Sequence, residues 1–145
     1  MTSPHRSPIT TAWLLPSLPL ALILAWLVLL PAGNADAAQA GTVQNGIASY
    51  YHDMFHGRKT ASGTRYDKSK MTAAHKHLPL GSEVRVTDTR TGRSVVVRVN
   101  DRGPFVKGRV IDLSRRAATE LGMLKKGLTK VKVEVLSVPK RRGGI

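Results

Sequence analysis

The stretch that decides the fold is Arg93–Phe105, which reads RSVVVRVNDRGPF. Its first half, Ser94–Val99, is rich in β-branched residues that favour extended backbone, and its apolar content predicts a largely buried strand. Asn100–Pro104 cannot continue the strand, because Asn and Asp form turns, Gly permits positive φ and Pro lacks an N–H donor. The strand therefore ends by presenting Asp101 and Arg102. A carboxylate and a guanidinium at the rim of a rigid sheet predict a functional site there.

Short alternating segments on both sides predict further strands. These strands are expected at Gly46–Tyr51, Met71–His75, Glu83–Asp88, Arg109–Leu113 and Lys130–Leu136. One short helix is expected at Ser114–Leu121, with Ser114 as its N-terminal cap and Gly122 as its C-terminal cap. Several short strands, one helix and glycine-rich corners predict a mainly β fold closed into a small barrel, because closure removes exposed sheet edges.

The N-terminal region has the pattern of an export signal. Arg6 precedes the apolar run Ala12–Leu30, and Ala35-Asp36-Ala37 provides a small-x-small cleavage pattern. We therefore expect residues 1–37 to be a signal peptide cut near Ala37 or Ala38, leaving no stable membrane anchor. An uncleaved anchor is the alternative, since the run approaches the ~20 residues that span a bilayer, but its two prolines favour cleavage.

The rest of the chain has the size of one domain. Residues 38–45 are expected to be a linker, 46–138 the domain and 139–145 a basic tail, within 145 residues of 41% hydrophobic content. The sequence contains no cysteine, so neither a disulfide nor lipidation on cysteine is expected. The four histidines beyond the leader follow no zinc spacing, and we expect no metal and no cofactor.

The net charge of +14 points to an anionic partner. Removal of the leader leaves this charge unchanged, because the leader contains one basic residue, Arg6, and one acidic residue, Asp36. An exported chain, in the periplasm, the cell wall or the medium, meets anionic lipid and anionic wall polymers. Nucleic acid is disfavoured by the absence of a basic recognition helix and of an RNA-binding aromatic motif. The alternative is that the positive charge serves only to keep the protein soluble.

Two features around the first predicted strand indicate ligand binding. Tyr50 and Tyr51 are neighbours in an extended segment and point to opposite faces, so one is expected in the core and the other as a stacking platform for a pyranose ring. The following segment, His52–Lys70, is long, polar and without periodicity, as functional loops often are. Arg58 in this loop either faces anionic substrate or is merely solvated.

Four segments of the chain resemble the rare lipoprotein A (RlpA) family of septal lytic transglycosylases. They are GIASYYHDMFHGRKTASG (Gly46–Gly63), TAAHKHLPLGSEVRV (Thr72–Val86), RSVVVRVNDRGPF (Arg93–Phe105) and GRVIDLSRRAATELGM (Gly108–Met123). The resemblance implies a six-stranded double-psi β-barrel with one or two short helices. Typical members carry a lipidated N-terminal cysteine and a C-terminal peptidoglycan-binding repeat domain. This chain shows neither, so septal targeting is not assumed.

The resemblance also implies a reaction on peptidoglycan glycan strands stripped of their peptides. The bond between N-acetylmuramic acid and N-acetylglucosamine is cleaved by attack of the muramyl 6-hydroxyl on its own anomeric carbon, which gives 1,6-anhydromuramyl ends without consuming water. Asp101 is the candidate acid and base, because one group can serve both steps of an intramolecular transfer. His75 and Arg102 are expected to orient it or to neutralise developing charge.

Thr64 departs from the family pattern. It follows Ala61-Ser62-Gly63, where the family typically has a glutamate that acts with the matching His and Asp. Threonine carries no charge near neutral pH, so three readings stay open: Asp101 suffices alone, the enzyme is slow, or the chain binds glycan without cutting it. The last would make it a wall-loosening module like the expansin and barwin relatives of the same barrel.

Overall fold

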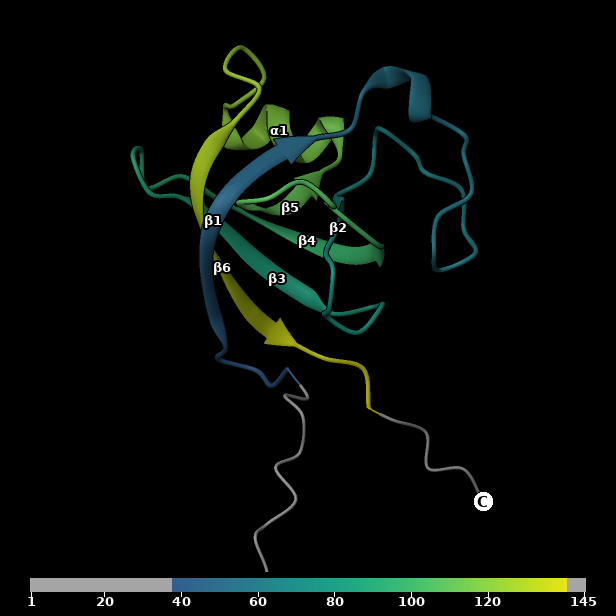
Figure 1. Cartoon of the computed structure of the whole chain (residues 1–145), viewed down its shortest axis with the longest axis horizontal. Helices are drawn as coiled ribbons and strands as arrows, with labels where there is room; N and C mark the ends of the chain where they lie inside the picture. Colours follow the sequence, from purple (N-terminus) through teal and green to yellow (C-terminus); the bar gives the residue numbers. More distant parts are fainter. Residues whose placement is uncertain (1–37, 141–145) are drawn as a thin grey trace, which may run out of the picture. The chain divides into compact units, whose positions relative to one another are not determined.

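The computed structural model describes residues 38–140, which form a closed barrel of six strands (Figure 1). The strands are β1 (Val43–Tyr50), β2 (Thr72–Ala74), β3 (Glu83–Asp88), β4 (Ser94–Asp101), β5 (Arg109–Leu113) and β6 (Thr129–Ser137). Helix α1 (Arg115–Leu121) packs against β1, β4 and β5, and one turn of 3₁₀-helix lies at Asp53–Phe55. The expected leader lies outside the described residues. No helix within residues 38–140 is long and apolar enough to cross a bilayer.

The strands follow the order β1-β5-β2-β4-β3-β6 around the barrel. Two neighbouring pairs, β1 with β5 and β2 with β4, are parallel, and the others are antiparallel. Parallel neighbours cannot be joined by a tight hairpin, so the chain must cross the ends of the barrel to form them. The expected mainly β, six-stranded double-psi barrel is confirmed.

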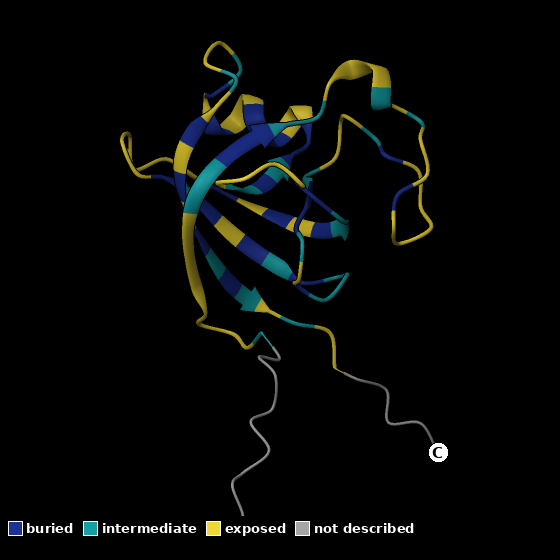
Figure 2. Ribbon diagram, viewed as in Figure 1, coloured by how far each residue is buried: buried dark blue, intermediate teal, exposed yellow. Residues whose placement is uncertain are grey.

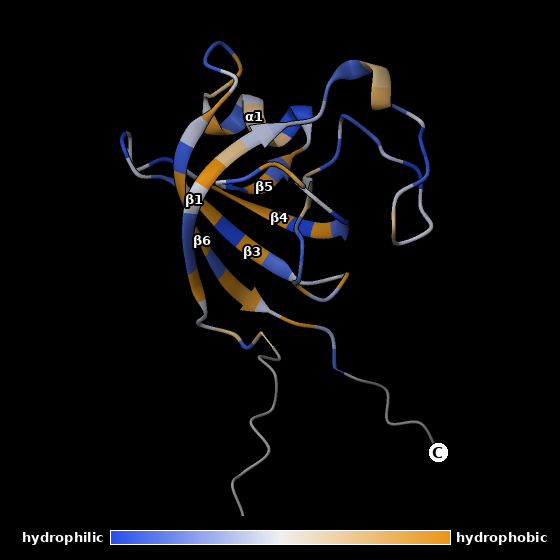
Figure 3. Ribbon diagram, viewed as in Figure 1, coloured by the Kyte–Doolittle hydropathy of each residue, from blue (hydrophilic) through white to orange (hydrophobic). Residues whose placement is uncertain are grey.

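The barrel interior is filled by valines from alternate positions of β3, β4 and β6. Val84 and Val86 of β3 pair with Val97 and Val95 of β4 and with Val135 and Val133 of β6. Each buried valine contributes about 1.5–3 kcal/mol of hydrophobic stabilisation. Figures 2 and 3 show the resulting alternation of buried apolar and exposed polar positions along the strands.

The expectation that Ser94–Val99 is largely buried is wrong for half of its residues. Val95, Val97 and Val99 point inward, whereas Val96 is 44% exposed and Arg98 faces solvent. The reason is that successive side chains of a barrel strand point to opposite faces, so even an unbroken valine run buries only every second residue.

The observed elements otherwise lie close to the predicted ones. The start of β1 is the main difference: it begins at Val43, inside the expected linker, because β6 offers backbone partners as far as Glu134. The helix caps agree with the prediction. The Ser114 hydroxyl accepts the N–H of Ala117, and Gly122 has left-handed backbone with φ of 80°.

Gly46 is required by a close approach inside the barrel wall. The side chain of Val110 fills the space that a Cβ at Gly46 would occupy. We therefore expect Gly46→Ala to lower the free energy of unfolding by about 1–3 kcal/mol through overpacking, as measured by urea denaturation. In a double-mutant cycle with Val110→Ala the two changes should be strongly non-additive, because the second substitution frees the space. Simple additivity would contradict the assignment.

Candidate active site

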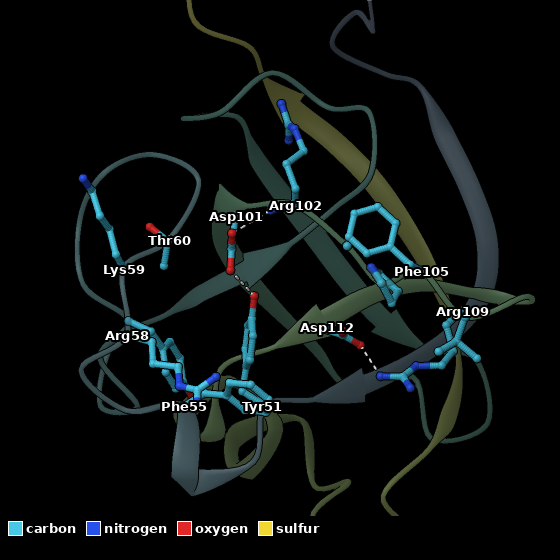
Figure 4. A pocket seen from close by; sticks show the side chains of 14 residues that line it. Tyr51, Phe55, Arg58, Lys59, Thr60, Asp101, Arg102, Phe105, Arg109 and Asp112 are labelled. Atoms are coloured by element: carbon cyan, nitrogen blue, oxygen red, sulfur yellow. Dashed lines mark hydrogen bonds and ion pairs between the residues drawn. The ribbon is translucent and has the colours of Figure 1, made fainter.

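A groove of about 420 Å³ opens where β4 ends at Asp101 (Figure 4). The loop that follows β1 contributes Phe55, Arg58 and Lys59 on one side, and the turn after β4 contributes Phe105 on the other. Its volume lies in the ~300–1,000 Å³ range of small-molecule sites. The His52–Lys70 segment, predicted to be a functional loop, therefore forms one border of this groove.

The Asp101 carboxylate is held by three hydrogen-bond donors. Its Oδ2 accepts the hydroxyl of Tyr51 at 2.6 Å. Its Oδ1 accepts the backbone N–H groups of Ala61 and Arg102, each at 2.9 Å. These donors come from the end of β1, from the loop and from the turn after β4. The carboxylate is thus fixed in position at the groove while still lining its open space.

Tyr51, rather than Tyr50, is the tyrosine that faces the groove. Its ring packs against Tyr66, with ring centroids 4.6 Å apart, and meets Phe55 edge-on at 5.9 Å. Burial, followed by the hydrogen bond to Asp101, raises the pKa of Tyr51 well above its usual value, so the phenol keeps its proton. Tyr50 packs partly against the core and donates its hydroxyl to the carbonyl of Leu124 at 3.2 Å.

Arg102 connects the groove to the segment that follows β2. Its Nη1 donates to the carbonyl oxygens of His75 and Leu78, at 3.1 and 2.9 Å. Its guanidinium is therefore tied to backbone while its own backbone N–H binds Asp101. In this position Arg102 braces the wall of the site.

His75 is buried in a neutral, fixed tautomer. Its Nδ1 accepts the backbone N–H groups of His77 and Leu78, both at 3.1 Å, so its Nε2 is the donor to Gln44 Oε1 at 2.8 Å. Burial, and then electrostatic repulsion of its charged form by the nearby His77 and Arg102, lower the pKa of His75 to about 4. Its side chain borders a separate depression of about 220 Å³ instead of the groove around Asp101.

Thr64 also lies outside the residues that line the groove. It is exposed, and its hydroxyl contacts the hydroxyls of Ser62 at 2.9 Å and Thr60 at 3.3 Å. Thr60 itself lines the groove. Of the seven candidate residues, the structure thus brings Asp101, Arg102, Tyr51 and Arg58 to one groove and leaves His75, Tyr50 and Thr64 around it.

Three further groove residues were not singled out from the sequence. Asp112 and Arg109 of β5 form a salt bridge of 2.7 Å, and the Ser49 hydroxyl contacts both partners. The signal for Asp112 was an acidic residue inside the apolar strand segment RVIDL. Phe105 is 82% exposed, and its signal was an aromatic residue in a turn directly after the site.

Comparisons with known proteins point to one family. The family model described as lytic transglycolase matches residues 43–133. An endolytic peptidoglycan transglycosylase RlpA of Pasteurella multocida is 55% identical over 102 residues, covering 70% of this chain and 35% of the relative. A probable endolytic peptidoglycan transglycosylase RlpA of Nostoc is 61% identical over 111 residues, covering 73% of this chain and 30% of the relative. The chain thus spans about a third of the length of these relatives.

Solved structures with the same fold include a Streptomyces papain inhibitor and an expansin of Clavibacter michiganensis. The inhibitor is 28% identical, with a TM-score of 0.58, and the match covers 70% of this chain and 99% of the inhibitor. The expansin is 22% identical, with a TM-score of 0.53, over 68% of this chain and 52% of the expansin, and shows the fold alone. With the family model matched over residues 43–133 and RlpA proteins as its relatives, the chain belongs to the lytic transglycolase family.

Proposed function

We propose that this chain is an exported peptidoglycan lytic transglycosylase that acts on peptide-stripped glycan in the periplasm or cell wall. It cleaves the bond between N-acetylmuramic acid and N-acetylglucosamine and leaves 1,6-anhydromuramyl ends. The observation that supports this best is the fixed carboxylate of Asp101, which lines a groove flanked by aromatic and basic side chains in a member of this family.

Asp101 is the proposed acid and base of the reaction. In its protonated form it gives a proton to the glycosidic oxygen as the bond breaks. The carboxylate so formed takes the proton of the muramyl 6-hydroxyl as that oxygen bonds to the anomeric carbon. The proton count balances without water. A phenol hydroxyl both donates and accepts, so Tyr51 can keep its hydrogen bond to Asp101 in either protonation state.

The second carboxylate of the groove is less suited to this role. Asp112 is engaged by Arg109 and Ser49, whereas Asp101 forms no salt bridge with any residue of the described range 38–140. An intramolecular transfer needs only one such group, in contrast to glycoside hydrolysis, which uses two carboxylates. The groove thus offers the single unpaired carboxylate that the proposed reaction requires.

His75 and Arg102 are proposed to act as positioning residues. Neutral His75 accepts hydrogen bonds from two N–H groups of the segment after β2, and Arg102 donates hydrogen bonds to two carbonyl groups of the same segment. Together they hold the backbone beside Asp101, whose carbonyl accepts the N–H of His75 at 3.1 Å. Because His75 stays neutral above about pH 4, it supports the site by orientation rather than by charge.

A glycan-binding, wall-loosening module without catalysis is the second candidate function. It is favoured by Thr64, a neutral residue at the position where the resemblance implies a glutamate. Incubation of purified protein with intact and peptide-stripped sacculi, followed by muropeptide analysis, separates the two functions. Anhydromuramyl products appear only if the chain is a transglycosylase.

Asp101→Asn should lower the rate of anhydromuramyl product formation by about 10²–10⁴-fold, the usual scale of general acid–base catalysis. The amide cannot exchange protons, yet it retains the shape of the carboxylate. Asp67→Asn, which alters a loop carboxylate bonded only to Ser69, is the matched control and should retain activity. Circular dichroism should show that both variants are folded. Glycan binding and activity lost in equal measure by Asp101→Asn would point to a binding role.

The pKa of His75 generates a pH dependence of stability. It is about 4 in the folded chain against 6.5 for an unperturbed histidine, so the unfolded chain binds the proton first as the pH falls. The free energy of unfolding should therefore decrease between about pH 6.5 and pH 4, as measured by urea denaturation. His75→Asn should flatten this dependence, whereas His52→Asn, at an exposed position, should not. An unchanged slope in His75→Asn would refute the assignment.

Thr64→Glu should raise the rate of anhydromuramyl product formation on peptide-stripped glycan at least about tenfold, or roughly 1.4 kcal/mol of barrier. A glutamate restores the carboxylate typical of the family and acts more on the transition state than on the ground state. Thr64→Gln, of the same length without the charge, is the control and should change little. If the native chain is already fast and Thr64→Glu leaves its rate unchanged or lowers it, Asp101 works alone.

A further inference from the structure

The groove around Asp101 has two sides of different chemistry (Figure 4). One side consists of Phe55, Arg58 and Lys59, and we call it the cationic wall. The other consists of Phe105 and Val106, and we call it the apolar wall. Because the walls lie on opposite sides of the same carboxylate, a ligand that fills the groove contacts both at once.

The apolar wall is exposed and directly follows two buried residues. Phe105 is 82% and Val106 is 51% exposed, although they follow the buried residues Gly103 and Pro104. The Phe105 ring lies over Gly103, whose Cβ position would be 3.7 Å from the ring Cε2 atom. A ring without a polar atom suits the C–H face of a sugar, so an exposed phenylalanine at the edge of the groove is available for stacking.

The cationic wall carries the uncompensated charge of the groove. Arg58 lies over the Phe55 ring, 5.1 Å from its centroid. Neither Arg58 nor Lys59 forms a salt bridge with another residue of the described range 38–140, whereas Arg109, at the far end of the groove, is bonded to Asp112. Arg102 also lines the groove without a salt bridge, but its guanidinium is bonded to two backbone carbonyl groups. The cationic groups without such contacts in the described range therefore lie on one side of Asp101.

We propose that this asymmetry sets the direction in which the glycan lies. The neutral sugar stacks on Phe105, and the sugar that bears a lactyl carboxylate lies at Arg58 and Lys59. The inference deepens the proposed function and rests on it: Asp101 then stands at the junction of the two sugars, with the leaving sugar on the apolar wall. Charge complementarity and stacking thus select a strand of alternating neutral and carboxylate-bearing sugars.

Binding of two glycans tests the assignment of the two walls. Calorimetric titrations in an Asp101→Asn background, which prevents turnover, should compare a neutral chito-oligosaccharide with peptide-free peptidoglycan strands. Added Phe105→Ala should weaken both ligands about tenfold. Added Arg58→Gln should weaken only the peptide-free strands, by about three- to tenfold at low salt, and the effect should shrink as salt screens the charge. Leu128→Ala and Lys132→Gln, both outside the groove, serve as controls.

The outcomes separate this inference from the proposed function. Phe105→Ala that binds like its parent, or Arg58→Gln that weakens both glycans equally, overturns the two-wall assignment. Phe105→Leu, which retains apolar area without the ring, should bind glycan more weakly than the parent and more tightly than Phe105→Ala. This conservative variant shows whether a loss of binding in Phe105→Ala reflects misfolding. Product analysis of the chain with Asp101 intact tests the transglycosylase activity separately. If the expected binding pattern is seen but no anhydromuramyl products form, only the transglycosylase activity is refuted. If products form without the binding pattern, only the two-wall assignment is refuted.

Discussion

The site depends on the hydrogen bonds that meet at the Asp101 carboxylate. Tyr51 reaches it from the end of β1, Ala61 from the long loop and the backbone of Arg102 from the turn after β4. The loop is tied to the same strand end a second time, because the N–H of Ser62 donates to the carbonyl of Asn100 at 3.0 Å. A loop with little regular structure is thereby fixed on a rigid barrel by the side chain proposed to react.

A second set of contacts braces the opposite side of Asp101. Arg102 donates to two carbonyl groups of the segment after β2. His75 accepts two backbone N–H groups of the same segment and contacts Gln44 of β1. These polar groups are partly or fully buried, where each loss of a partner costs about 1–3 kcal/mol. Their value to the site lies in rigidity, because a proton must be delivered to a particular oxygen of a bound glycan.

Local sequence patterns predicted the secondary-structure elements well. Features that depend on contacts between distant segments could not be predicted in the same way. The alternation of Glu83–Asp88 and the caps of α1 are local features and agree with the structure. The start of β1 depended on its partner β6, and the exposure of Val96 on the closure of the sheet into a barrel with one solvent-facing side. Asp101 could be predicted because turn chemistry marks the strand end. Its bond to Tyr51, 50 positions earlier in the chain, could not.

Of the two carboxylates that line the groove, Asp112 forms a salt bridge, whereas Asp101 forms none within residues 38–140. Asp112 is neutralised by Arg109, and Thr64, which lies outside the groove lining, adds no carboxylate to it. The positive charge of Arg58 and Lys59 is therefore opposed within the groove by Asp101 alone. Such a groove favours an anionic glycan in the ground state, whereas an added carboxylate would weaken that attraction and support developing positive charge on the sugar ring.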